Sequence, residues 1–265
     1  MNVPTTVGAA MVLSLVMVAI FAPMLAPYDP ARAVAPTYGD PGAPSLKFPM
    51  GTDELGRDVM SRIIYGARIS LTVGIAAMAG TLIIGVTIGV CAGFFGDSVD
   101  FVLMRFTDVM LTLPALLLAM AFVAVLGPSL LNVLFVIGLV SWTQVARVVR
   151  AETLSMSNRD FVLAARALGA PSRRLILRHL LPNVLPIIVV MAALGTSGTL
   201  LLDAALSFLG LGVPPPTPSW GRMISEATIY FRTAPWLATF PGLAIFYAVL
   251  GFNLLGYGFL GRRAQ

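Results

Sequence analysis

The chain has 265 residues, of which 58% are hydrophobic and only 11% are charged, and its mean hydropathy is +0.91. Soluble domains carry roughly 25% charged residues, so this composition excludes a water-soluble protein and predicts an integral membrane protein. The net charge of +5 lies mostly in and around residues 160–186, which argues against binding to nucleic acid. A single cysteine, Cys91, excludes an internal disulfide, and a single histidine, His179, excludes a histidine metal cluster, so no metal site is expected.

Six apolar runs dominate the sequence, and each is about as long as the roughly 20 residues that a transmembrane helix needs. The first run has no basic start of the kind found in signal peptides, so it is predicted to be a span. The second contains glycines that predict close packing against other helices: Gly74, Gly80, Gly85 and Gly89. The prediction is an all-α membrane protein of one domain, 1–265, with about six spans at 7–26, 69–94, 102–126, 130–149, 185–209 and 237–260.

Residues 27–68, between the first two spans, begin as a Pro- and Gly-rich loop and end in a predicted helix, 53–68. Thr52 or Asp53 is the expected cap of this helix. Its apolar positions recur every three or four residues, opposite a polar face made of Arg57, Asp58, Ser61 and Arg62. Such an amphipathic helix lies on the membrane surface or packs on the protein's own spans, and the sequence does not choose between them.

Two acidic residues fall inside predicted spans, where ionisable groups are costly and face the protein interior or a water path. Asp108 lies in the third span, which also contains Pro114, and is expected to pair with Arg105 one turn away. Asp203 lies in the fifth span. It either lines a pathway, where it could contact a cationic substrate terminus, or it bonds to an arginine or a backbone amide.

Uncharged polar residues in the spans are further candidates for the lining of a pathway, namely Thr196, Ser197, Thr199 and Asn253. Serine and threonine often bond back to their own helix, which is the alternative for three of them. Aromatic residues near the last span are expected to form an interfacial belt rather than a ligand cage, namely Trp220, Tyr230 and Trp236.

A basic segment, 150–184, separates the fourth and fifth spans. Apolar residues at helical spacing predict a helix, a bend at Gly169–Pro171, a second helix and a stop at Pro182. The positive-inside rule places this segment in the cytoplasm, and six spans then place both termini there, with Arg262 and Arg263. The segment is either an ordinary basic loop or an element that contacts another protein.

Within this segment, Ala164-Ala165, Gly169 and Leu181-Pro182 form the pattern A-A-x-x-x-G-x(11)-L-P. The pattern resembles the EAA loop of the membrane subunits of ATP-driven (ABC) importers, with Leu163 where the family has glutamate. The resemblance implies a type I ABC importer permease fold, in which a coupling helix docks into a groove of the ATPase subunit. It assigns coupling to Phe161, Ala164, Ala165, Arg166, Gly169, Leu181 and Pro182.

Two other stretches narrow the resemblance, G-T-D-E-L-G-R-D-V-M-S-R at 51–62 and L-S-F-L-G-L-G at 206–212 followed by P-S-W-G at 218–221. Both are similar to the second permease subunit of the dipeptide, oligopeptide and nickel importers. The resemblance implies a heterodimer with a second permease, two ATPase subunits or a fused ATPase, and an extracytoplasmic substrate-binding protein, in a bacterial or archaeal cytoplasmic membrane. Candidate extracytoplasmic contacts are Asp53, Arg57, Asp58 and Trp220.

The sequence has no G-x-x-x-x-G-K-[ST] loop, and its one lysine, Lys47, lies in a Pro-rich loop. The chain is therefore not expected to bind ATP itself, and ATP with magnesium would belong to the partner subunits. No cluster of acids, histidine and cysteine points to an enzyme. The remaining alternative to an importer subunit is an ion-coupled secondary transporter, for which internal repeats would be expected and are not found.

Overall fold

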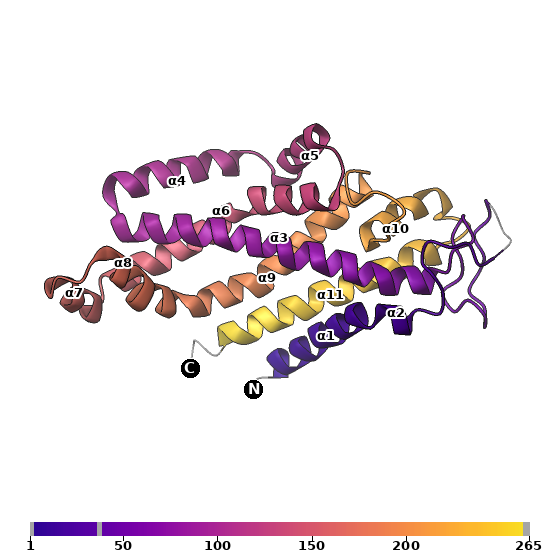
Figure 1. The fold of residues 1–265 in the computed structure, drawn as a ribbon, viewed down its shortest axis with the longest axis horizontal. Helices are drawn as coiled ribbons and strands as arrows, with labels where there is room; N and C mark the ends of the chain where they lie inside the picture. The colour runs from indigo at the N-terminus through magenta and orange to yellow at the C-terminus, as the bar shows by residue number, and fades with distance from the viewer. Residues whose placement is uncertain (1–2, 36–38, 262–265) are drawn as a thin grey trace.

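The structure is a computed structural model that describes residues 3–35 and 39–261, so Arg262 and Arg263 lie outside the described residues. Over the described ranges the chain is helical, and its extended pairings are two isolated bridges, Ala33 to Arg57 and Thr52 to Asp58. Figure 1 shows long helices side by side in an elongated bundle, with short helices and loops at both ends. We call these the α7 end, for α7 (Asp160–Ala167), and the α10 end, for α10 (Trp220–Ala227).

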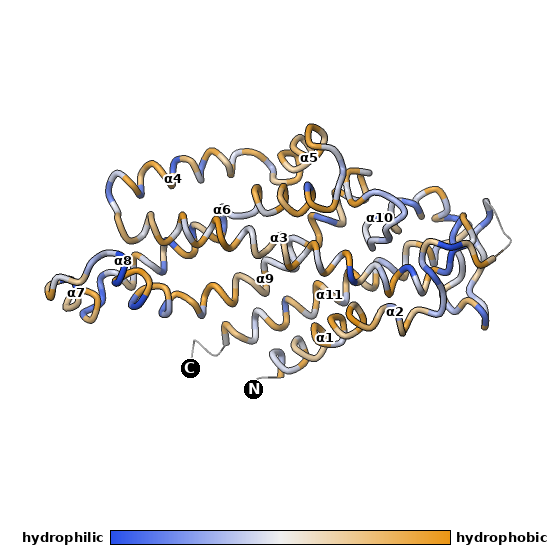
Figure 2. Tube along the Cα trace, viewed as in Figure 1, coloured by the Kyte–Doolittle hydropathy of each residue, from blue (hydrophilic) through white to orange (hydrophobic). Residues whose placement is uncertain are grey.

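Five helices in the described part of the chain are long and apolar enough to cross a membrane, and a bent pair raises the number to six. The five are α1 (Val3–Ile20), α3 (Val59–Phe95), α6 (Leu130–Ser157), the continuous helix Ser172–Phe208 and α11 (Trp236–Gly261). Figure 2 shows hydrophobic residues along these helices and hydrophilic residues gathered toward the two ends. The chain is a multi-pass membrane protein, and the prediction of an all-α fold with about six spans is confirmed.

The third predicted span, 102–126, is not one straight helix. The chain instead forms α4 (Asp97–Thr112) and α5 (Ala115–Leu126), which meet at an angle of 85°. Pro114 causes the break, because its ring forces Leu113 into an extended conformation (φ −94°, ψ 130°) and it has no N–H to continue the ladder of α4. The same proline then begins α5, where its carbonyl accepts a hydrogen bond from Leu118 N at 3.1 Å.

The predicted separate helix 53–68 is also wrong. Residues 53–58 form a turn, and α3 begins at Val59, where the Asp58 carboxylate caps it by accepting a bond from Ser61 N at 2.8 Å. From there α3 continues without a break for 37 residues. At 1.5 Å per residue it is about 55 Å long, well beyond the roughly 30 Å of a bilayer's hydrocarbon core. The polar residues assigned to a surface helix are therefore the cap and first turns of a span.

The glycines of α3 allow it to approach α6 closely, as predicted for this span. A Cβ at Gly85 would lie 2.7 Å from Val145 Cβ, and one at Gly89 would lie 2.6 Å from the carbonyl oxygen of Ala146. Such distances leave no room for a side chain, so the two backbones touch over this stretch. On the other face, Leu15 of α1 and Phe252 of α11 pack with Leu71 of α3 in a common apolar core.

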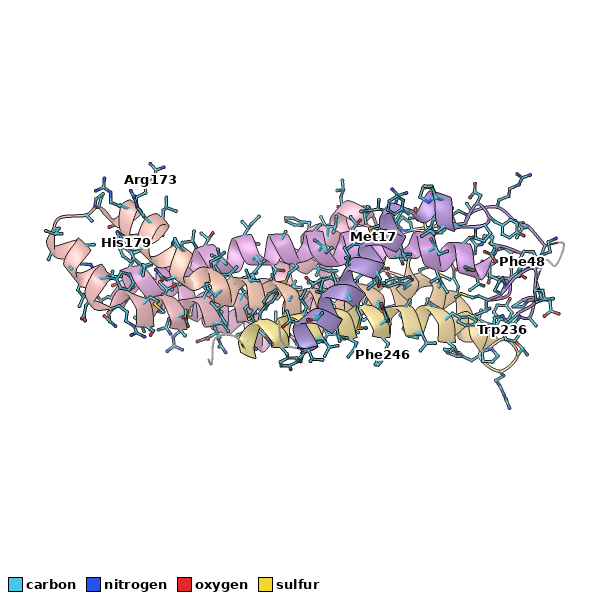
Figure 3. All side chains as sticks on the ribbon, turned by 90° about the horizontal axis from the view of Figure 1, so that it is seen from below. Met17, Phe48, Arg173, His179, Trp236 and Phe246 are labelled. Carbon is cyan, nitrogen blue, oxygen red and sulfur yellow. The ribbon has the colours of Figure 1, made fainter. Side chains whose placement is uncertain are left out.

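At the α10 end, α1 is followed by the short helix α2 (Ala22–Leu25) and the loop that leads to α3. This loop packs beside α10 and the 3-10 turn η2 (Thr228–Tyr230) through an apolar cluster around Val59 and Met223. At the α7 end, α7 is followed by α8 (Ser172–Arg174), the π-helix η1 (Leu175–Leu180) and α9 (Leu181–Phe208). Figure 3 shows Arg173 and His179 at one extremity and Phe48 and Trp236 at the other.

Candidate functional site

The bend predicted at Gly169 closes helix α7 with a specific set of backbone bonds. Gly169 has a φ of +80°, a value that L side chains rarely adopt. Its N–H donates to the carbonyl of Arg166 at 3.0 Å, and the N–H of Ala170 donates to the carbonyl of Ala165 at 3.1 Å. This pair of bonds is the Schellman motif, in which a left-handed glycine ends a helix and satisfies its last carbonyls. Gly169 and Ala165 therefore hold the shape of the segment through their backbones.

One side of α7 is anchored in the protein. Val162 is fully buried and forms a cluster with Leu175 and Leu180, against which Phe94 of α3 also packs. The guanidinium of Arg166 lies over the Phe94 ring, 5.5 Å from its centroid. These contacts connect α7 to α3, α6 and η1, and η1 continues directly into α9.

The other side of α7 presents apolar side chains to the outside. Phe161, Leu163 and Leu168 are 44%, 45% and 88% exposed, and Ala164 is exposed beside them. The α7 end also carries three exposed arginines, Arg173, Arg174 and Arg178, and Figure 3 shows Arg173 pointing outward. A short capped helix with an apolar outer face is the form that a helix takes when it fits into a groove of another protein.

Pro182 does not stop the helix, contrary to the prediction. The chain is helical from Ser172 to Phe208. The π-helical stretch η1 lies directly before the proline and allows the helix to continue through it. There the N–H of Leu181 donates to the carbonyl of Ile176, five residues back. The wider turn shifts the register of the hydrogen bonds, so Pro182 falls in the first turn of α9, where its missing N–H costs little. Leu181 and Pro182 therefore join the α7 segment to the span instead of separating the two.

The stretch 51–62 forms a buried network of ion pairs at the α10 end. Asp53 accepts a bond from Arg57 Nε at 2.7 Å and is also paired with Arg62. Arg62 Nη2 donates to Glu226 of α10 at 2.8 Å. Partial burial raises the pKa of Glu54, next to this network, above its ordinary value. The network ties the loop, α3 and α10 together.

The four candidate extracytoplasmic contacts are not on the surface. Asp53, Arg57, Asp58 and Trp220 are 4%, 6%, 0% and 1% exposed. The Trp220 indole N–H donates to the carbonyl of Ile63 at 3.0 Å, so this residue is also no part of an interfacial belt. The prediction of surface contacts is therefore wrong for the isolated chain. Charged residues that look solvent-facing in the sequence are paired with one another inside the fold.

A cavity lies in the angle of the bent pair α4–α5, facing α6 and α9. Its volume is about 460 Å³. None of the described residues that line it is charged, and its polar lining consists of Thr81, Ser141, Thr143, Gln144 and Thr199. Gln144 and Ser141 were missed in the sequence, although the polar pair within the apolar run of α6 was a usable signal. The cavity can receive a small solute through hydroxyl and amide groups.

Of the candidate pathway residues, Thr199 lines this cavity, and its hydroxyl is bonded to the carbonyl of Gly74 at 2.8 Å. Thr196 and Ser197 are buried and bond back to their own helix, to the carbonyls of Ala192 and Leu194. Asn253 donates to the carbonyl of Val249 in α11, at 2.9 Å. The structure does not bring these three to the cavity wall.

The acidic residues of the spans have different surroundings. Asp203 is 1% exposed and borders a small void near Ser70 and Trp220, away from the cavity. Asp108 pairs with Arg147 of α6 at 2.6 Å, and not with Arg105 as predicted, because α4 and α6 lie side by side. Among the described residues, no group of three His, Cys, Asp or Glu side chains is placed to hold a metal ion.

Residues 85–262 match the model of the family "Binding-protein-dependent transport system inner membrane component", and residues 2–44 match "N-terminal TM domain of oligopeptide transport permease C". The chain belongs to this permease family. The match includes α7, its glycine cap, the cavity lining from α4, α5, α6 and α9, and α11.

Several curated permeases are similar over nearly the whole chain. The dipeptide transport system permease protein DppC of Alkalihalophilus pseudofirmus is 44% identical over 252 residues, which cover 95% of this chain and 82% of the relative. The DppC of Escherichia coli K12 is 44% identical, covering 97% and 87%. The glutathione transport system permease protein GsiD of Shigella boydii is 43% identical, covering 95% and 82%.

A solved structure of the MetNI methionine ABC transporter, in inward facing conformations, has a chain with the same fold. The TM-score is 0.61 at 15% identity, over 76% of this permease and 97% of that chain. The fold is thus that of an ABC importer permease. Membership of a binding-protein-dependent transport family favours the importer interpretation over the ion-coupled carrier.

Proposed function

We propose that this permease forms half of the translocation path of an ATP-driven importer of dipeptides, oligopeptides or related small solutes. A second permease subunit would supply the other half of the path. The names of the similar permeases, which include dipeptide and glutathione transport, support the substrate class. The uncharged polar lining of the 460 Å³ cavity also supports it, because peptide backbones offer amides and carbonyls to such groups.

The observation that carries the proposal is the continuity between α7 and the cavity wall. The helix that begins at Ser172, next to the α7 cap, runs without a break to Thr199 and Leu202 at the cavity. The 28 residues from Ser172 to Thr199 span about 40 Å. A rigid helix of this length transmits a tilt at one end to the other. The buried Val162–Leu175–Leu180 cluster fixes α7 to this helix, so the two would move together.

In this mechanism the exposed face of α7 docks into a groove of a cytoplasmic ATPase subunit. ATP and magnesium bind to the two ATPases, or to a fused ATPase, and their closure moves α7 and with it α9. The α7 end then lies in the cytoplasm of a bacterium or archaeon, where the positive-inside rule places the arginines Arg173, Arg174 and Arg178. Six spans would return both termini to the same side. A binding protein would deliver the substrate at the α10 end.

The test uses the complex of both permeases and the ATPases, reconstituted in lipid with its binding protein. Leu163→Asp places a charge on the exposed face of α7 without touching its buried anchor. We expect this variant to lose ATPase subunits on purification and to lose ATP-driven uptake of a labelled dipeptide. Leu46→Asp, at a fully exposed leucine of the opposite end, is the matched control and should assemble normally. Uptake at the normal rate without any ATPase subunit would refute the proposal in favour of a carrier.

A further inference from the structure

A second hollow, separate from the cavity at the bend, lies between α1 and α3. Its volume is about 300 Å³, and its lining is Val16, Ala19, Ile20, Arg68, Leu71 and Ile75. Five of the six are apolar, and the sixth, Arg68, has an exposed side chain. No ion pair or side-chain hydrogen bond engages its guanidinium within residues 3–35 and 39–261. The groove thus combines an apolar wall with one cation that none of the described residues pairs with.

The groove has a polar rim and an apolar floor. Arg68 immediately precedes the long apolar stretch of α3 that begins at Ile69, so it stands where that helix enters the membrane. Ile75 is seven residues further along and lies about 10 Å deeper. The opposite wall has the same gradient, because α1 runs toward the α10 end and Val16 lies about 6 Å deeper than Ile20. An arginine at such a level extends its stem over apolar surface and keeps its charge among headgroups.

We propose that this groove binds a membrane phospholipid, with the headgroup phosphate on Arg68 and one acyl chain between α1 and α3. The charge and the shape of the groove favour this occupant. A free inorganic anion would use the guanidinium but leave the apolar wall uncovered, whereas a bare alkyl chain would leave the cation unpaired. A phospholipid pairs its phosphate with Arg68 at the rim and covers the deeper apolar wall with an acyl chain. The bound lipid would join α1 to the rest of the bundle on this face.

The inference goes beyond the transport function and can be tested without it. The whole complex is purified in detergent, incubated with phosphatidylglycerol, and analysed by native mass spectrometry for retained lipid. Arg68→Gln should lower retention about fivefold, the contribution of one interfacial arginine to an anionic headgroup. Ala19→Leu, which fills the groove, should lower it as well. The matched controls are Arg232→Gln, an exposed arginine elsewhere, and Ala10→Leu, on an exposed part of α1; neither should change retention.

Three results would overturn the inference. Unchanged lipid retention in Arg68→Gln would show that the guanidinium does not hold the headgroup. Displacement of the lipid by millimolar inorganic phosphate would identify a free-anion site instead. Loss of the second permease subunit from Ala19→Leu would show that this partner fills the groove. A complex that retains lipid but transports nothing would refute the proposed transport function and leave the lipid site intact.

Discussion

Gly169→Ala is the substitution that tests the proposed coupling role of α7 most directly. A Cβ at Gly169 would meet no atom within 4 Å, so the change causes no clash. Its whole effect comes from the φ of +80°, where an L residue costs about 1–2 kcal/mol. That cost destabilises the two hydrogen bonds that close α7, from Gly169 N to the carbonyl of Arg166 and from Ala170 N to the carbonyl of Ala165. The population in which the end of α7 is open should therefore rise about 5- to 30-fold.

Hydrogen exchange measures this opening at individual amides, and dipeptide uptake in the reconstituted complex measures its effect on coupling. We expect faster exchange at Gly169 and Ala170, and uptake that falls while ATP hydrolysis continues. Gly127→Ala is the control, because Gly127 also has a positive φ, +83°, and open space around it, but lies between α5 and α6. Gly169→Asn should lose less uptake than Gly169→Ala, since asparagine tolerates this conformation better. Normal exchange in Gly169→Ala, or an equal loss of uptake in Gly127→Ala, would refute the reasoning.

Three further substitutions test the packing. Asp53→Asn removes the carboxylate that two buried arginines share, and should lower the free energy of unfolding by about 3–5 kcal/mol. The melting temperature of the purified complex should fall accordingly, and an unchanged melting temperature would contradict a buried network. Gly89→Ala places a Cβ against a backbone carbonyl of α6 and should cost about 1–3 kcal/mol, whereas Gly242→Ala, with open space around it, should be tolerated in the same assay. Asp108→Asn breaks a half-exposed pair with Arg147, so its cost should stay below about 1 kcal/mol, and a larger drop in melting temperature would show that the pair is shielded from water.

Local signals in the sequence predicted much of the fold. Long apolar runs are stable only inside a membrane, so the approximate number of spans was predictable from the composition of these runs. The bend at Gly169–Pro171 was also predictable, since glycine and proline act on the backbone at their own positions. The close approach of α3 and α6 followed from glycine spacing for a similar reason: Gly85 and Gly89 lie one turn apart on one face.

The errors have a common physical origin in contacts that sequence does not display. Pro114 and Pro182 carry the same local penalty, yet one breaks a span by 85° and the other sits inside a continuous helix. The difference lies in η1, whose π-helical register accommodates Pro182 because Leu175 and Leu180 are held by buried packing. Arg57 and Arg62 were assigned to a polar surface because their buried partners lie on a turn and on α10.

The candidate site was predicted unevenly for the same reason. The α7 segment is contiguous in sequence, so a single pattern indicated its residues. The cavity is assembled from α3, α4, α5, α6 and α9, and its polar groups, such as Gln144 and Thr199, come from helices far apart along the chain. Periodicity cannot show which hydroxyl lines a cavity: Thr196 and Thr199 lie three residues apart on α9 and both donate to carbonyls of that helix, yet of the two it is Thr199 that lines the cavity. What joins the two parts is α9 itself, because the helix that leaves the Gly169 bend also forms a wall of the cavity. A change in the strain at one glycine is therefore expected to act on the cavity proposed as part of the substrate path, about 40 Å away, without altering any residue that lines it.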